Sequence, residues 1–241
     1  MIMERGGART GGRALRKVPV MEQNVLHRAV AEAFTRTGEA TPPWPDPHAG
    51  RDAREEEYER CTHPEKYRIL AARAEAWTRA LCEGALAVAE EADNLAGLWH
   101  KPGDVTVVDA VRLRPVRADA LPLVFGYAAV DGVSGAALVI GAGEPAVQVG
   151  LLPDCGCDAC DGGSDGLLEA VDELVMAVVS GAFVHVDAGR GREIIATGQD
   201  EWSASDWDDE RFPVGETLAA ARAGRSPYEV VLGAPWGQAE A

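Results

Sequence analysis

The sequence has 241 residues with a formal net charge of −16, and 46% of its residues are hydrophobic. This length suffices for one large domain, or a domain with a helical appendage, that buries a stable core without disulfides. The negative charge repels phosphates and anionic lipid, and no apolar stretch approaches the roughly 20 residues of a membrane span. We therefore expect a soluble globular protein with no nucleic-acid or membrane partner.

Residues 1–20 are expected to form a disordered basic leader, because they are glycine-rich and lack hydrophobic periodicity. A single acidic residue, Glu4, accompanies five basic ones: Arg5, Arg9, Arg13, Arg16 and Lys17. The leader lacks the apolar core of a secretory signal, so we expect a cytoplasmic protein whose thiols stay reduced. Met21 follows directly, which makes both Met1 and Met21 candidate translation starts.

Residues 21–50 are expected to contain one helix and a proline-rich strap. Apolar residues recur at helical spacing between Met21 and Arg36. The segment Thr41–His48 then holds four prolines, which remove backbone donors and favour extended geometry. We expect Trp44 to anchor this strap on the rest of the protein.

Residues 51–241 are expected to form a single α+β domain that begins with helices. A short helix is predicted over Asp52–Arg60, and Thr62–Glu65 has the sequence of a capping box that opens a long helix. We expect Gly84 to bend or interrupt this helix. Its buried face comprises residues spaced by three or four positions: Tyr67, Leu70, Ala74, Trp77, Leu81, Val88 and Leu95.

Four β-rich runs follow, over residues 105–113, 121–130, 136–140 and 146–151, and the turn residues between them predict an antiparallel meander. A helix over Ser164–Ser180, capped by Ser164 and Gly181, comes next. Residues 183–196 predict a hairpin, followed by a loop at 202–207, a short helix near 216–223 and a final run over 228–236. We expect an α+β fold: N-terminal helices packed on a mostly antiparallel sheet, with a Cys-rich connection leading into a core helix and a closing hairpin.

The Cys-rich connection, Cys155-Gly-Cys157-Asp-Ala-Cys160, holds three of the five cysteines of the chain. Thiolates are preferred ligands of zinc, and three neighbouring thiolates repel one another unless a cation binds them. Aspartates at positions 154, 158 and 161 add negative potential that favours a cation. We therefore predict that Cys155, Cys157 and Cys160 bind zinc, in a structural role.

A structural zinc site takes four protein ligands, so this motif is one ligand short. The candidates for the fourth are nearby carboxylates or residues at the start of the long helix: Asp154, Asp158, Asp161, Cys61 and His63. His185 is disfavoured, because a helix of about 17 residues carries the chain roughly 25 Å away and a strand recovers only about 3.3 Å per residue. An open fourth position holding water would be the catalytic version of the site.

Other interpretations of the chemistry remain open. Cys157 and Cys160 have the spacing of a redox dithiol with Cys155 as a resolving thiol, although the neighbouring aspartates oppose thiol ionisation. Alternatively, the cysteines only build the connection. The carboxylates of residues 206–210 would suit magnesium but are more typical of a solvated loop. The sequence has no G-x-S-x-G elbow, P-loop or H-E-x-x-H motif, so it identifies no reaction.

Several segments between about Trp44 and Trp236 resemble an uncharacterised actinobacterial family classed as a domain of unknown function. The segments that carry the resemblance are EEEY at 55–58, THPE at 62–65, YRIL at 67–70, CGCDACD at 155–161, VSGAF at 179–183, WSAS at 202–205 and LGAPW at 232–236. The resemblance implies a discrete domain and identifies no substrate.

The function favoured by the sequence is that of a cytoplasmic accessory or regulatory protein with a zinc site at Cys155, Cys157 and Cys160. One alternative is an enzyme that uses an open metal site or a reactive thiol at the same cysteines. A second alternative is a protein-interaction domain that docks through the proline-rich strap and whose cysteines are inert.

Overall fold

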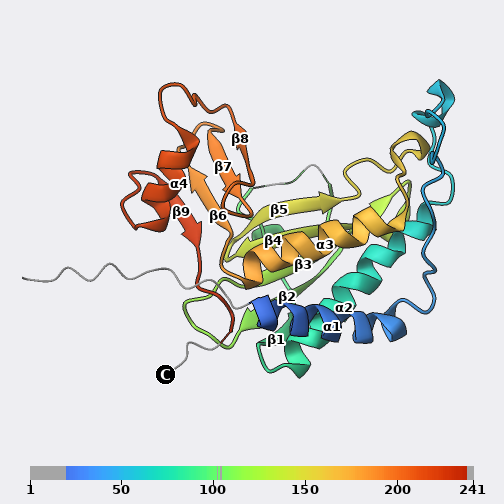
Figure 1. The fold of residues 1–241 in the computed structure, drawn as a ribbon, viewed down its shortest axis with the longest axis horizontal. Helices are drawn as coiled ribbons and strands as arrows, with labels where there is room; N and C mark the ends of the chain where they lie inside the picture. The colour runs from blue at the N-terminus through green and yellow to red at the C-terminus, as the bar shows by residue number, and fades with distance from the viewer. Residues whose placement is uncertain (1–19, 102, 104, 238–241) are drawn as a thin grey trace, which may run out of the picture.

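The computed structural model describes residues 20–101, 103 and 105–237 (Figure 1). The predicted basic leader lies outside the described residues, apart from Val20, at which the first helix begins.

Helix α1 (Val20–Thr37) confirms the helix expected from Met21. It packs against α2 (Ile69–Glu83), and α2 in turn lies on one face of a five-stranded sheet beside α3 (Ser164–Val179), as Figure 1 shows. These helices and the sheet enclose the main core, whose largest side chains include Tyr67 and Trp77. The expected packing of N-terminal helices on an antiparallel sheet is therefore confirmed.

The start of α2 differs from the sequence pattern. A 3₁₀ helix, η2 (Pro64–Arg68), precedes α2, and the expected capping box does not form, because the Thr62 hydroxyl donates to Asp158 instead. The helix predicted over residues 52–60 is a single 3₁₀ turn, η1 (Glu55–Glu57). This turn buries Glu57, whose carboxylate accepts hydrogen bonds from the Arg51 guanidinium and the Arg54 amide.

The end of α2 also comes earlier than predicted. Gly84 follows the last helical residue, and Ala85 adopts a left-handed φ of 55°, which a continuing helix does not allow. The prediction that Val88 and Leu95 extend the buried face was wrong. Val88 is 59% exposed in a strand, and Leu95 begins the 3₁₀ helix η3 (Leu95–Gly97). The chain leaves the helix after Gly84, and the residues that follow pair with the meander, which satisfies their backbone hydrogen-bonding groups.

The predicted meander is confirmed, with one further strand at its edge. The strands pair antiparallel in chain order: β1 (Ala87–Glu91), β2 (Asp109–Pro115), β3 (Leu123–Val130), β4 (Val133–Gly143) and β5 (Ala146–Leu152). Gly141, predicted as part of a turn, lies inside β4. The ring of Trp99 covers it on the outer face of the sheet, where a Cβ at Gly141 would approach Trp99 Cζ3 within 2.5 Å.

A second antiparallel sheet contains the predicted closing hairpin. Its strands are ordered β8 (Trp202–Ser205), β7 (Glu193–Ala196), β6 (Val184–Asp187) and β9 (Glu229–Leu232). Helix α4 (Val214–Arg222) covers it and completes a small core around Val186, Ile194 and Leu218. The predicted loop at 202–207 is thus partly an edge strand.

The α+β class is confirmed, with two antiparallel sheets. Among the helices that the structure describes, none combines the length and hydropathy needed to cross a bilayer.

Candidate metal centre

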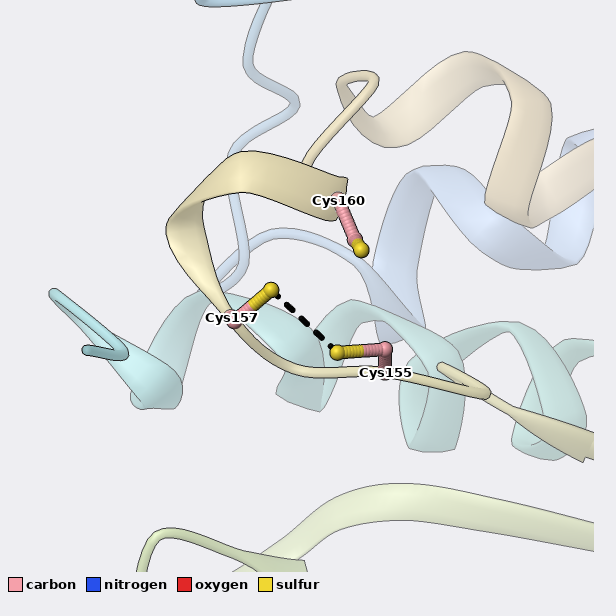
Figure 2. Close-up of side chains that lie close together, drawn as sticks. All are labelled: Cys155, Cys157 and Cys160. Carbon is pink, nitrogen blue, oxygen red and sulfur yellow. Dashed lines mark hydrogen bonds between the residues drawn. The ribbon is translucent and has the colours of Figure 1, made fainter. Parts of the chain in front are cut away.

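The Cys-rich connection forms a short loop between β5 and α3, and it contains one 3₁₀ turn, η4 (Asp158–Cys160). Gly156 lets this loop lie against the end of β3, because a Cβ there would approach Val130 Cγ1 within 2.5 Å. Figure 2 shows the side chains of Cys155 and Cys157 turned toward each other and that of Cys160 turned toward the same space from the 3₁₀ turn. The motif therefore gathers three thiols on one side of the loop.

The spacing of the three sulfurs suits a metal ion. They lie within 4.8 Å of one another, and the Cys155 thiol donates a hydrogen bond to Cys157 Sγ at 3.2 Å. Tetrahedral zinc with bonds of about 2.3 Å separates its sulfur ligands by about 3.8 Å, which lies between these two distances. A disulfide needs a separation of about 2.05 Å, and all five cysteines are free thiols.

The thiols also influence one another's ionisation. Burial raises the pKa of Cys157, but hydrogen bonds from Cys155, Cys160 and two backbone amides outweigh burial and leave the pKa below its ordinary value. The hydrogen bond to Cys157, followed by that to Cys155, raises the pKa of Cys160 to about 12. One thiolate is thus stabilised at the expense of a second. A bound cation removes this conflict because it attracts every thiolate.

Asp158 fastens one side of the loop to the segment before α2. Its carboxylate accepts hydrogen bonds from the amide and hydroxyl of Thr62, both at 2.6 Å, and from Arg60 Nε at 2.8 Å. Its own amide donates to the Arg60 carbonyl at 2.8 Å. Burial raises the pKa of Asp158, but these donors outweigh burial and lower it. The carboxylate therefore holds the loop in place and has its oxygens occupied.

Asp161 fastens the other side of the loop to the proline-rich strap. It is 5% exposed, accepts hydrogen bonds from Trp44 Nε1 at 2.8 Å and Gly163 N at 2.9 Å, and pairs with the Lys66 ammonium. The Trp44 backbone also exchanges hydrogen bonds with Ser164, so Trp44 anchors the strap as predicted. The prediction that Ser164 caps α3 was wrong: Gly163 occupies the cap position, and the Ser164 hydroxyl bonds to the Trp44 backbone.

A fourth ligand is not present beside the three cysteines. Within residues 20–101, 103 and 105–237, no other His, Cys, Asp or Glu side chain joins the group. Cys61 is half-buried and packs against the main core, and burial, followed by the charge of Asp131, raises its pKa. The His63 side chain is 76% exposed and contacts Glu65, and Asp154 is exposed as well. The structure thus brings together the three cysteines of the motif, and the residues considered for the fourth ligand do not join them.

His185 lies at the opposite end of the molecule, in β6 of the second sheet (Figure 1). It is 1% exposed, and its Nε2 is hydrogen bonded to Glu193 Oε2 at 2.9 Å. Burial raises the pKa of Asp187, but hydrogen bonds from the Gly189 amide and Lys101 outweigh burial and lower it to about 2. Lys101 pairs with both Asp187 and Glu193, so these residues and His185 form one polar cluster. Sequence reasoning missed this cluster, and the only signal for it was the alternation that places residues 185 and 187 on one strand face.

The acidic loop before α4 shows no convergence on a cation. Asp208 accepts a hydrogen bond from the Arg211 amide at 3.1 Å, and Asp209 accepts one from the Val214 amide at 2.8 Å. The first contact lies within the loop and the second satisfies the first amide of α4, which agrees with the solvated-loop interpretation.

No curated protein and no solved structure matches this chain. The model of a family of unknown function, DUF6226, matches residues 30–240, a range that includes α2, both sheets and the Cys-rich loop. This range agrees with the extent of the resemblance seen in the sequence. The chain therefore belongs to this family of unknown function, DUF6226.

Proposed function

We propose that the protein is a cytoplasmic accessory or regulatory protein that binds one zinc ion through Cys155, Cys157 and Cys160. The observation that supports this most strongly is the convergence of the three sulfurs within 4.8 Å of one another. Zinc is favoured among metals because thiolate ligands suit it and because an all-sulfur set is unsuited to magnesium or calcium.

The frame around the loop supports the proposal further. Asp158 and Asp161 hold the two sides of the loop through contacts that need no metal, so the sulfurs are already positioned before an ion binds. Little ordering of the backbone then opposes binding, which raises affinity. The same frame implies that zinc strengthens the connection between β5 and α3 without being required for the fold.

The test is the metal content of tag-free protein purified without added metal. We expect about one zinc per chain in the wild type and almost none in Cys157→Ser. Cys82→Ser is the matched control, because Cys82 lies in α2, outside the cluster, and this variant should retain its zinc. Wild-type protein that contains no zinc and takes none up from stoichiometric zinc would refute the proposal and favour a domain with inert cysteines.

Zinc removal supplies a second readout. Chelation should leave the far-UV circular dichroism unchanged, because the loop is held by its own hydrogen bonds. Readdition of zinc at about 100 times its Kd should stabilise the wild type by about 2.7 kcal/mol and leave Cys157→Ser unaffected. An enzyme with an open metal site is the second candidate, and the observation in its favour is the exposure of Cys155 and Cys160.

A further inference from the structure

We infer that a metal ion at Cys155, Cys157 and Cys160 keeps one coordination position that no His, Cys, Asp or Glu side chain of the described residues fills, and that this position takes a small neutral donor. Water occupies it at rest, and the imidazole nitrogen of an external ligand replaces the water. The inference rests on the proposed function, since it concerns the same ion. It adds that the ion is an accessible binding site for a ligand and not only a link within the fold.

The first argument is the supply of soft ligands. The chain has five cysteines and five histidines, and every one of them lies in the described part of the chain. Cys82 is in α2, Cys61 packs against the main core, and neither joins the cluster. In this structure neither thiol completes the site.

None of the five histidines joins the three sulfurs. His48 lies between the Asp161 carbonyl, 3.1 Å from its Nδ1, and Glu57, 3.5 Å from its Nε2. His63 points to Glu65, and the ring of His27 packs edge-on against Trp77. The last two, His100 and His185, belong to the polar cluster at the second sheet.

The second argument concerns the carboxylates of the loop. Asp158 accepts three hydrogen bonds, and Asp161 accepts two and pairs with Lys66. Either residue would have to abandon these partners to reach the ion, and the loop would lose the contact that positions its cysteines. Asp154 is exposed and does not join the cluster, so we treat it as the one carboxylate that requires a direct test.

The third argument is access and charge. Cys155 and Cys160 are exposed, so solvent and small ligands can reach the group of thiolates. Zinc with three thiolates carries a net charge of about −1. The neighbouring Asp158 and Asp161 pair with Arg60 and Lys66, so these two cations are already engaged by carboxylates. A neutral donor therefore suits the position better than an anionic one.

Cobalt(II) provides the test, because its visible absorption reports the geometry and the ligands of a site that normally holds zinc. The tag-free full chain is loaded with one equivalent of cobalt and titrated with imidazole. We expect a saturable 1:1 shift of the visible bands, with half-saturation at a concentration about tenfold below that for azide, a small anionic ligand. Asp154→Asn, Cys61→Ser and His63→Ala should give the wild-type spectrum and the same titration.

Each outcome decides a separate claim. Stoichiometric cobalt binding with a spectrum that imidazole does not change would overturn this inference and leave the proposed function intact. Loss of sulfur-to-cobalt absorption in Cys61→Ser, or an altered spectrum in Asp154→Asn, would overturn it by identifying the fourth ligand. Azide binding as tight as imidazole would refute the preference for a neutral donor. A chain that binds no cobalt or zinc would refute the proposed function and this inference together.

Discussion

Replacement of Asp161 by alanine should destabilise the protein by about 3 kcal/mol, even without metal. The substitution removes the acceptor for Trp44 Nε1 and the Gly163 amide and breaks the pair with Lys66. A hydrogen bond to a charged group contributes about 1.5–3 kcal/mol. The Lys66 side chain is 20% exposed and can regain water, which limits its share, but Gly163 is buried and its amide is left unsatisfied.

Asp161→Asn separates the hydrogen bonds from the charge. Asparagine retains an oxygen for the Trp44 and Gly163 donors but loses both the charge and the acceptor opposite Lys66, so we expect a loss of about 1–1.5 kcal/mol. Asp154→Ala, in the same loop but exposed, is the control and should change stability by less than about 0.5 kcal/mol.

The assay is urea unfolding of chelated protein, followed by circular dichroism. With an m-value of about 3 kcal/mol/M, the midpoint should fall by about 1 M in Asp161→Ala and by less than half of that in Asp161→Asn. A loss below about 1 kcal/mol in Asp161→Ala, or equal losses in the two variants, would refute the view that Asp161 fastens the strap to the loop.

Two further predictions concern the rest of the fold. Gly141→Ala should lower the free energy of unfolding by about 1–3 kcal/mol, measured by thermal unfolding, because its Cβ would lie 2.5 Å from the Trp99 ring. Gly215→Ala in α4 is the control: its Cβ meets open space, so this variant should be neutral or stabilising. Similar losses in both variants would contradict the packing argument. Asp187 has its pKa lowered to about 2, so its carboxylate stabilises the fold above the unfolded pKa of about 3.9, and this contribution disappears as the pH falls toward 2. The stability difference between wild type and Asp187→Asn, up to about 2.5 kcal/mol near pH 6, should therefore shrink in acid, and a difference that is independent of pH would contradict the assignment.

Local pattern was a good guide where a segment has one buried face. Helices α1 and α3 and the four-strand meander appear at their predicted places because apolar spacing alone decides which side of each faces the core. The same apolar spacing led to a predicted helix that is longer than α2. Val88 and Leu95 match its helical spacing, but the left-handed Ala85 and the pairing of β1 with β2 place them elsewhere.

Polar side chains were the harder case, because their partners are distant in sequence. Thr62 and Ser164 both have the residue type of a helix cap, yet each bonds to a segment about 100 residues away, at Asp158 and Trp44. A capping hydroxyl and a long-range one are chemically identical, so only the tertiary contact distinguishes them. The polar cluster around His185 escaped notice for the same reason.

The sequence by itself identified the three candidate thiol ligands, since Cys155, Cys157 and Cys160 are close along the chain and a short loop with Gly156 between them allows convergence in few ways. It also located the strap, and the strand and the helix on either side of the motif. Only the tertiary structure decided the role of the aspartates: Asp158 and Asp161 were candidate ligands by proximity, but long-range donors occupy their oxygens. The number of ligands offered by this chain is therefore set by which polar groups the fold has already paired.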